Sequence, residues 1–318
     1  MRRILVIVAL TACALVAWAG KGGGGKPGGG GGGSFTPTVV FTHGTEGQLQ
    51  ATDYDGSQIQ TVTKFSVFSA SWKPDGSGFV AATDVGGAGI YSLSASGKKE
   101  ALLFSMDAGT AGDARPVWSV GPSPTGAQLI AYLDEDSAQR DVIYVGNTDG
   151  TNRTLLVPGQ ANQYIYTLDF HPSGSSIATA VYTGSSAEIV ILELGLDGGG
   201  NVEVANWIPV SDVAESPLQG SGAIWPVFSR AGDKLAVLSG PAWRRDIYEI
   251  DLSDYTSVTN VTQGQIGVQQ LGGYGPLDDE IYFTDNTTRT LHVINTDGTG
   301  LAQVFPDAPL AMNVALKP

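Results

Sequence analysis

Cysteine and histidine are almost absent from this chain, and both absences limit its chemistry. The 318 residues include one cysteine, Cys13, and three histidines, His43, His171 and His292. A single cysteine so close to the N-terminus leaves the folded part without a disulfide bond. The three histidines do not have the spacing of a zinc site, so we interpret each of them as structural.

Charged residues are also scarce, and most of them are acidic. Only 15% of the residues are Asp, Glu, Lys or Arg. Four of the 17 Lys and Arg residues precede Phe35, which leaves 13 basic against 31 acidic residues after that point, a net charge near −18. Because phosphate binding needs the opposite sign, we exclude nucleic acid as a partner.

The one long apolar run lies at the N-terminus. Residues 1–19 read MRRILVIVALTACALVAWA, with a basic start, an apolar segment too short to span a bilayer comfortably, and small residues before Gly20. This pattern predicts a cleaved signal peptide. The LTAC tetrapeptide at 10–13 supports an alternative, in which residues 1–12 are the signal and a lipid-modified Cys13 begins the mature chain. A third alternative is an uncleaved anchor.

A glycine-rich segment separates this leader from the rest of the chain. Residues 20–35 read GKGGGGKPGGGGGGSF, which has almost no surface to bury and predicts a flexible tether. A tether is most useful where one of its ends is held, which favours retention at a membrane. Residues 36–318 are then the folded domain.

Five segments of that domain follow one template. Each has an aromatic or small residue, a tight polar turn around Pro-Asp-Gly or a variant of it, and an alternating strand rich in Val, Ile, Ala and Tyr. The segments begin at Trp72 (WKPDGSGFVAATD), Gly121 (GPSPTGAQLIAYLD), Phe170 (FHPSGSSIATAVYT), Phe228 (FSRAGDKLAVLSG) and Tyr274 (YGPLDDEIYFTD). A fixed repeat of this kind predicts a repetitive β architecture.

Each segment is followed by a further strand and then by a short final one. Several of the further strands end in Asp-Gly, at Asp149-Gly150, Asp197-Gly198 and Asp297-Gly298, where we expect two-residue hairpin turns. Each unit therefore holds four strands in roughly 45 to 55 residues, which is typical of a propeller blade.

The two ends of the domain are complementary fragments of one more unit. Residues 39–63 match the second, third and fourth strands of the template, and the first strand is missing there. Residues 310–318, LAMNVALKP, supply a first strand alone and end on Leu316-Lys317-Pro318, in the place of Trp72-Lys73-Pro74. The sequence thus predicts an all-β fold, a six-bladed β-propeller with one blade closed by strands from both termini, so that no long sheet edge stays exposed.

This repeat resembles that of TolB-type β-propellers, a WD40-like family, over residues 36–318. The resemblance is carried by the Trp/Phe-x-Pro-Asp-Gly turn, the apolar strand after it, and the Ile-Tyr and Asp-Gly pairs of the next strand. Two copies depart from it, FSRAGD without the Pro and GPLDDE without the Gly, and we expect distorted turns there. The TolB protein carries an α/β domain before its propeller that has no counterpart here. The resemblance therefore implies a periplasmic binding propeller without identifying its partner.

An enzyme on this fold is the second interpretation. Propeller-bearing peptidases place their serine on a separate hydrolase domain, and this chain has no G-x-S-x-G elbow. Pectate-type lyases on related propellers resemble metal enzymes with several histidines around the channel, which the three separated histidines do not match. A hydrolase or lyase acting on a polysaccharide in the channel would need paired acidic residues about 5 to 10 Å apart.

The ends of the six second strands present one set of polar residues: His43, Asp84, Asp134, Thr183, Ser239 and Asp285. Because blades are related by rotation, we expect these residues to form a ring at the channel mouth. Three carboxylates in a ring could hold Ca²⁺ through oxygen ligands. We favour the alternative that Asp and Ser cap their own loops, and we expect no cofactor.

The loops that lead into the first strands are rich in large side chains. We predict that Arg115, Tyr164, Tyr166, Trp225 and Tyr274 contact a partner there, because aromatic and arginine side chains dominate interface energetics. The alternative is that several of them pack between blades, and for Trp225 the two interpretations are equal.

Together these patterns indicate an exported, monomeric and non-catalytic binding module of the bacterial cell envelope. It would be periplasmic, or a lipoprotein that touches the membrane only through a lipid on Cys13, and its partner would be an envelope protein or a glycan. A purely structural surface protein is the remaining alternative.

Overall fold

The computed structural model describes residues 38–304 and 311–317, apart from 44–46, 55, 57, 108 and 185. Within this part the chain forms 24 β-strands and one short 3-10 helix, η1 (Ala111–Asp113). The predicted signal peptide, Cys13 and the predicted tether lie outside the described residues. In the part that the structure describes, no helix has the length and hydropathy needed to cross a bilayer.

The strands form six antiparallel sheets of four strands each, which are the blades. Blade 1 consists of β4 (Ser69–Trp72), β5 (Gly78–Thr83), β6 (Gly89–Ser94) and β7 (Lys99–Ser105). Blade 2 consists of β8 (Val117–Trp118), β9 (Leu129–Glu135), β10 (Asp141–Asn147) and β11 (Thr154–Val157). Blade 3 consists of β12 (Tyr164–Phe170), β13 (Ser176–Tyr182), β14 (Ala187–Leu196) and β15 (Val202–Pro209).

The second half of the chain continues the same order of strands. Blade 4 consists of β16 (Ile224–Phe228), β17 (Lys234–Ser239), β18 (Asp246–Asp251) and β19 (Asp254–Asn260). Blade 5 consists of β20 (Val268–Tyr274), β21 (Glu280–Asp285), β22 (Leu291–Asn295) and β23 (Ala302–Gln303). Blade 6 consists of β24 (Ala311–Leu316), β1 (Val39–His43), β2 (Gln48–Thr52) and β3 (Ile59–Ser66).

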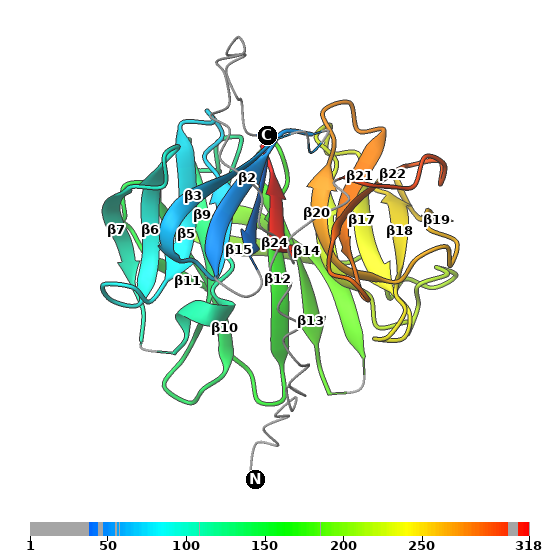
Figure 1. The fold of residues 1–318 in the computed structure, drawn as a ribbon. Coiled ribbons are helices and arrows are strands. Elements are labelled where there is room, and N and C mark those ends of the chain that lie inside the picture. The colour runs from blue at the N-terminus through cyan, green and yellow to red at the C-terminus, as the bar shows by residue number, and fades with distance from the viewer. Residues whose placement is uncertain are drawn as a thin grey trace, which may run out of the picture. The chain divides into compact units, whose positions relative to one another are not determined.

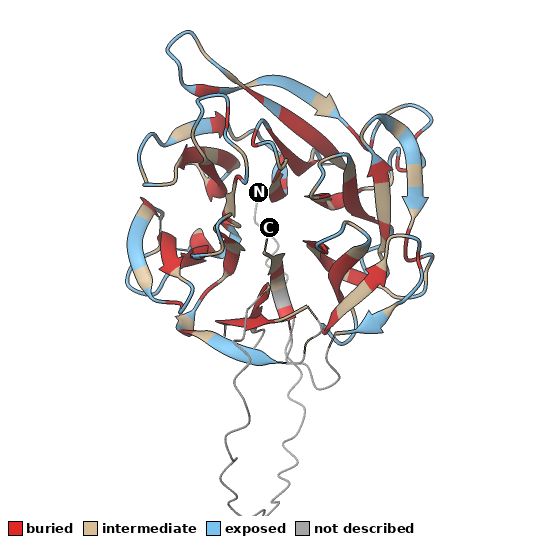
Figure 2. Cartoon of the chain, turned by 90° about the horizontal axis from the view of Figure 1, so that it is seen from above, coloured by how far each residue is buried: buried red, intermediate tan, exposed pale blue. Residues whose placement is uncertain are grey.

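The six blades are arranged in a ring, as the view from above in Figure 2 and the side view in Figure 1 show. The first strand of each blade lies innermost and contacts the first strands of its neighbours. The predicted all-β, six-bladed propeller is therefore confirmed. We call the face on which the innermost strands begin the front face, and the face on which they end the back face.

Blade 6 is closed by strands from opposite ends of the domain, as predicted. β24 pairs antiparallel with β1, with Leu316 opposite Val39 and Ala315 opposite Val40. The amide of Lys317 also donates to the carbonyl of Thr38 over 2.7 Å. This pairing leaves neither β24 nor β1 as a free inner edge, which protects the sheet from pairing with other chains.

The core lies between neighbouring blades. All six residues of β5 are buried, whereas the outermost strand β7 is largely exposed. Ile143 of blade 2 and Ile177 of blade 3 belong to one buried cluster, in which each blade covers its neighbour. Inner strands are therefore covered on both faces, which explains their continuous runs of Val, Ile, Leu and Ala.

The two turns that depart from the repeat keep their shape, so the expected distortion is wrong. In FSRAGD the amide of Gly232 still donates to the carbonyl of Ser229 over 3.0 Å. In GPLDDE, Asp278 takes the glycine position with φ of 58°. Its carboxylate accepts hydrogen bonds from the amides of Arg230 and Ala231 in the neighbouring blade, at 2.7 and 2.9 Å. These two bonds stabilise a conformation that Asp tolerates better than most residues.

Blade 2 corrects the alignment of its repeat. The position of Trp72 is taken by Trp118, not by Gly121, because the amide of Ser119 donates to the carbonyl of Leu129 as that of Lys73 does to Gly78. The intervening turn is longer in blade 2 and contains GPSPTG at its tip. The GPSPTG segment therefore resembles the repeat in sequence, but it does not occupy the structural position of the repeat turn.

The Asp-Gly hairpins also differ from the two-residue turns that we expected. Among these pairs only Gly150 and Gly298 have positive φ, at 87° and 84°, and Asp149 and Asp297 do not. Each of these two aspartates instead accepts a hydrogen bond from the amide two residues later, at 2.9 Å in both cases. At the third site the positive φ falls on Gly200 rather than Gly198. The turns are therefore one or two residues longer, with the aspartate as an internal cap.

Candidate functional site

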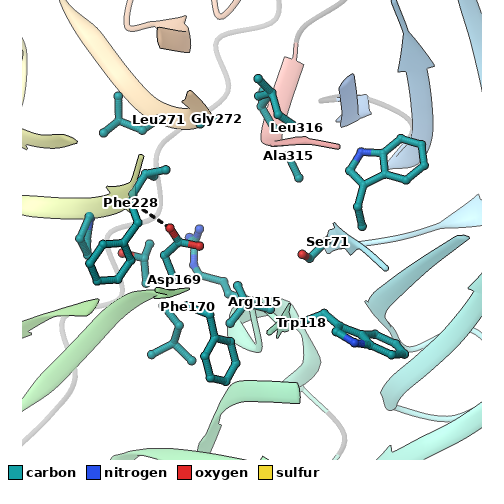
Figure 3. Close-up of a pocket in the computed structure, with 18 of the residues that line it drawn as sticks. Ser71, Arg115, Trp118, Asp169, Phe170, Phe228, Leu271, Gly272, Ala315 and Leu316 are labelled. Atoms are coloured by element: carbon teal, nitrogen blue, oxygen red, sulfur yellow. Dashed lines mark hydrogen bonds between the residues drawn. The ribbon is translucent and has the colours of Figure 1, made fainter. Parts of the chain in front are cut away.

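The channel contains a cavity of about 360 Å³. Its wall is formed by the innermost strands of all six blades, as the close-up in Figure 3 shows. Many of the lining side chains are apolar. Arg115 and Asp169 point into the space, and Arg230 also lines the cavity. A concave, mostly apolar site with a few polar groups is the usual form of a small-ligand site.

Three lining residues share an unusual backbone conformation. Arg115, Trp225 and Asn313 have φ of 41°, 62° and 48°. Each lies three residues before the end of an innermost strand, in blades 2, 4 and 6 respectively. The pairing register of the innermost strand shifts at this position in blades 4 and 6. Non-glycine residues rarely adopt positive φ, and such strain gathers at functional sites.

These three residues meet across the channel, and we call them the Arg-Trp-Asn clasp. The guanidinium of Arg115 lies 4.6 Å from the ring centroid of Trp225, within the range of a cation-π contact. It also donates to Oδ1 of Asn313 over 3.3 Å. The clasp therefore joins three alternate blades through one side chain.

Neighbouring strands hold the other two members of the clasp. The indole N–H of Trp225 donates to the carbonyl of Leu271 over 3.2 Å. The amide of Asn313 donates to Oε1 of Gln270 over 2.8 Å, and its side-chain amide donates to the carbonyl of Phe68. Blades 1 and 5 thus fix the ring and the amide against which the guanidinium rests.

Burial lowers the pKa of Arg115, and the negative charge of nearby Asp113 opposes that shift. A guanidinium stays protonated in proteins even so, which means that the charge must be accommodated by its neighbours. Within the described ranges, no carboxylate forms an ion pair with Arg115. The clasp holds its cation with an aromatic face and an amide oxygen alone.

Asp169 is the second ionisable group of the cavity. It lies one residue before the end of β12, and its Oδ2 accepts the amide of Phe228 over 2.8 Å. Burial raises the pKa of Asp169 to about 7, while the amides of Phe228 and Phe170 act in the opposite direction. Asp169 therefore changes its charge near neutral pH and joins blade 3 to blade 4.

A group of aromatic side chains lies on the front face of blades 3 and 4. Tyr164 and Tyr166 are 55% and 40% exposed, and the ring of Tyr182 lies 6.1 Å from that of Tyr164. Burial and Tyr182 raise the pKa of Tyr166, and the charge of nearby Arg245 lowers it. In the same loop as Arg245, Trp243 is 72% exposed. We call these five residues the aromatic patch.

Tyr274 does not lie where we expected it. The loop that we assigned to it forms most of β20, and Tyr274 is the last residue of that strand, on the back face. Its side chain is only 3% exposed, and its hydroxyl donates to Oε2 of Glu249 over 3.0 Å. Tyr274 takes the repeat position of Trp72, a residue that packs between blades. The prediction that Tyr274 lies on the binding face is therefore wrong.

The other four predicted contact residues lie on the front half of the propeller, in two groups. Tyr164 and Tyr166 are on the surface, as we expected. Arg115 and Trp225 instead contact each other inside the channel. Asn313 and Asp169 were missed by the sequence reasoning, because each is a single departure from the repeat within an otherwise ordinary strand.

The ring of second-strand residues lies at the front ends of its strands, and its carboxylates are bonded within their own blades. Asp134 pairs with Arg153 over 2.8 Å. Asp285 accepts the amides of Thr287 and Thr288 at 2.7 and 2.9 Å. These bonds agree with a capping role. Calcium binding at the ring stays a prediction.

The remaining ring members have varied surroundings: Asp84 is exposed, Thr183 and Ser239 flank the loops after β13 and β17, and His43 ends β1.

The two histidines outside the ring lie in separate places. His171 contacts the hydroxyl of Ser173 at 2.7 Å and the carbonyl of Gly232 at 2.9 Å. The ring of His292 stacks on Phe283. In the part of the chain open to description, no three His, Cys, Asp or Glu side chains gather in a way that could hold a metal ion.

The chain is a six-bladed β-propeller, and its fold is similar to that of TolB structures. No protein-family model matches the sequence, and no curated protein sequence matches it either. Several solved structures, however, match the fold of the chain. TolB from Acinetobacter baumannii is 17% identical with a TM-score of 0.69, and the match covers 90% of this chain and 68% of that one.

Two further structures show how widely the fold is shared. A structure assigned as TolB from Agrobacterium tumefaciens is 16% identical with a TM-score of 0.59, over 86% of this chain and 90% of that one. A chain of a nidogen/laminin complex is 12% identical with a TM-score of 0.64, over 88% and 98% of the two chains. At these identities the likeness is one of fold.

Proposed function

We propose that this propeller is a non-catalytic binding module of the bacterial cell envelope and that its front face binds a protein partner. The observation that carries the proposal is the aromatic patch, in which Tyr164 and Tyr166 are exposed near Arg245 and Trp243 is exposed in the same loop as Arg245. Tyrosine, tryptophan and arginine supply most of the energy in protein interfaces. Large exposed aromatic side chains gathered at one place mark an interaction surface.

The charge of the domain supports the same choice of face. The rest of the chain is strongly acidic, whereas the loop at residues 240–245 carries two adjacent arginines, Arg244 and Arg245. A partner with acidic side chains is attracted to this loop and repelled elsewhere, so that charge orients the encounter. A glycan partner, the alternative, would stack on the same aromatic rings without the dependence on salt.

The described chain enters the propeller on the back face. Thr38 precedes β1, and β1 begins on the back face, where β24 ends. Export and the periplasmic location belong to this proposal and are supported by the leader sequence and by the TolB-like fold. A lipid on Cys13 is the alternative to simple cleavage of the leader, and the LTAC tetrapeptide supports it.

The alternative of a polysaccharide hydrolase or lyase has less support in the site. Asp134 forms an ion pair with Arg153, and Asp285 caps its own loop in a different blade, which favours structural roles over an acid-base pair.

The nidogen/laminin structure shows that a propeller of this fold can be part of a protein complex, and that observation concerns that protein alone.

Site-specific photo-crosslinking in the native envelope tests the proposal. We expect a photoreactive residue at Tyr164 or Trp243 to crosslink the same protein, and the crosslinked band to weaken as salt rises. Trp207 is the matched control, because it is 39% exposed on the outermost strand β15, away from the front face. An equal yield from Trp207, or no crosslinked protein from either patch position, would contradict the proposal.

A further inference from the structure

The cavity of about 360 Å³ is lined by Arg115, which forms no ion pair among the described residues although the negative charge of Asp113 lies nearby. Arg115 reaches into the cavity, and its guanidinium donates to Oδ1 of Asn313 over 3.3 Å. A guanidinium has five N–H donors in a rigid planar fork. Among the residues open to description, the other donors have no carboxylate partner, so they are available to an anion that enters the cavity.

The contact with Trp225 leaves these donors free for a ligand. The guanidinium lies over the indole ring with its carbon 4.6 Å from the ring centroid. A planar cation held through its face keeps its N–H groups directed outward at its edge, which is the geometry that matches both oxygens of a carboxylate. The indole is fixed in turn by its bond to the carbonyl of Leu271.

The remainder of the lining is mostly apolar. Its apolar part includes Ala70, Val117, Val227, Leu271 and Ala315, and its polar part includes Ser71, Thr167 and Asp169. The apolar part of this wall matches an aliphatic or aromatic body. The position of the clasp on three strained backbone segments indicates a preorganised site, because positive φ at non-glycine residues is kept only where the surroundings enforce it.

We propose that the Arg-Trp-Asn clasp binds a small organic acid, with its single carboxylate on Arg115 and its apolar body in the channel cavity. Asn313 positions the guanidinium, and Trp225 supports it from one side. This site uses none of the five residues of the aromatic patch, so it goes beyond the proposed protein binding and can be present or absent independently of it.

Isothermal calorimetry with paired probes tests the site. We would titrate acetate, hexanoate and phenylacetate, each against its neutral amide, at up to millimolar concentrations into the whole domain. Hexanoate or phenylacetate is expected to bind at least about tenfold more tightly than its amide, because a charge-assisted hydrogen bond is stronger than a neutral one. Acetate is expected to bind more weakly than either, since it leaves the apolar wall exposed.

Substitutions locate the site and separate it from the surface. Arg115→Gln is expected to abolish the preference for acid over amide, whereas Arg244→Gln, which removes an exposed front-face arginine, is expected to keep it. Where Arg115→Gln does not fold, Arg115→Lys replaces it and is expected to lose several-fold in affinity, because an ammonium cannot form the planar fork.

Three results would overturn the inference: no saturable binding of any acid by the unmodified domain, equal affinity for acid and amide, or unchanged preference in a folded Arg115 variant. Each would show that the clasp serves only to tie blades 2, 4 and 6 together. The crosslinks from the aromatic patch are independent of all three results.

Discussion

Two ionisable groups that point into one cavity, Arg115 and Asp169, lie in different surroundings. Arg115 contacts the ring of Trp225 and donates to Asn313, and all three of these residues have positive φ. Asp169 lies in a regular strand and accepts a hydrogen bond from the amide of Phe228.

The difference follows from what each group can do with its proton. A guanidinium remains charged at any physiological pH, so the protein must build surroundings for it, and it does so with side chains from alternate blades. A carboxyl group can become neutral, so burial raises the pKa of Asp169 to about 7 and no counter-charge is needed. The charge of Arg115 is therefore accommodated by packing, whereas the charge of Asp169 depends on pH.

The largest effect is expected from breaking the clasp at its ring. Trp225→Ala removes a half-buried indole from the channel wall and leaves the Arg115 guanidinium without its aromatic face. We expect the free energy of unfolding to fall by about 3 kcal/mol at any pH, and Trp225→Phe to cost about 1 kcal/mol. Chemical denaturation followed by circular dichroism measures both.

Trp207→Ala is the control for that experiment, because Trp207 lies on the outermost strand of blade 3. We expect this substitution to cost less than about 1 kcal/mol. Equal destabilisation by Trp225→Ala and Trp207→Ala would mean that the indole in the channel contributes no more than one on the surface.

The free energy of unfolding is expected to depend on pH through Asp169. The pKa of Asp169 is raised in the folded state, so the native state binds more protons than the unfolded chain between pH 4 and pH 7, and stability falls as the pH rises through that window. Asp169→Asn should remove this fall, a difference of roughly 2 kcal/mol across the window, because solvent in the cavity screens part of the cost.

The control for Asp169→Asn is Asp149→Asn in a surface hairpin. Hydrogen bonds from Thr151 lower the pKa of Asp149, so its contribution to stability is present above its unfolded pKa and is lost as the pH falls. Urea midpoints measured from pH 4 to pH 8 distinguish the two signs. A profile of Asp169→Asn that parallels the unmodified domain would show that Asp169 is not the group that titrates.

The sequence predicted the repeat well and the site only in part, for physical reasons. Blade number, strand order and the closure of β24 on β1 follow from turn chemistry and alternating apolar residues, which recur in every copy. The FSRAGD and GPLDDE turns kept their shape, because bonds from other blades stabilised Asp278 in the place of a glycine.

The parts of the site that escaped prediction depend on contacts across the ring. Asn313 stands in a short terminal strand, and nothing in its neighbours along the chain shows that it contacts Arg115, which lies two blades away around the ring. Tyr274 looked like a loop residue, because the length of β20 is set by pairing with β21 and not by its own glycines. A repeat therefore shows where the strands are, and the channel chemistry comes from single residues that depart from it.

The smallest effect is expected from separating backbone strain and side-chain contact at Asn313, whose φ is 48°. Asn313→Ala loses the side-chain bonds to Arg115 and to the carbonyl of Phe68, and also a residue type that tolerates positive φ, so we expect a loss of about 1 to 2 kcal/mol. Asn313→Gly loses the same side-chain bonds but relieves the conformation, so it should be about 0.5 kcal/mol more stable than the alanine variant. Denaturation midpoints of the two variants, compared at one pH, make the measurement. If alanine is tolerated as well as asparagine, neither the strain nor the contact holds the clasp together, and Trp225 alone supports the guanidinium.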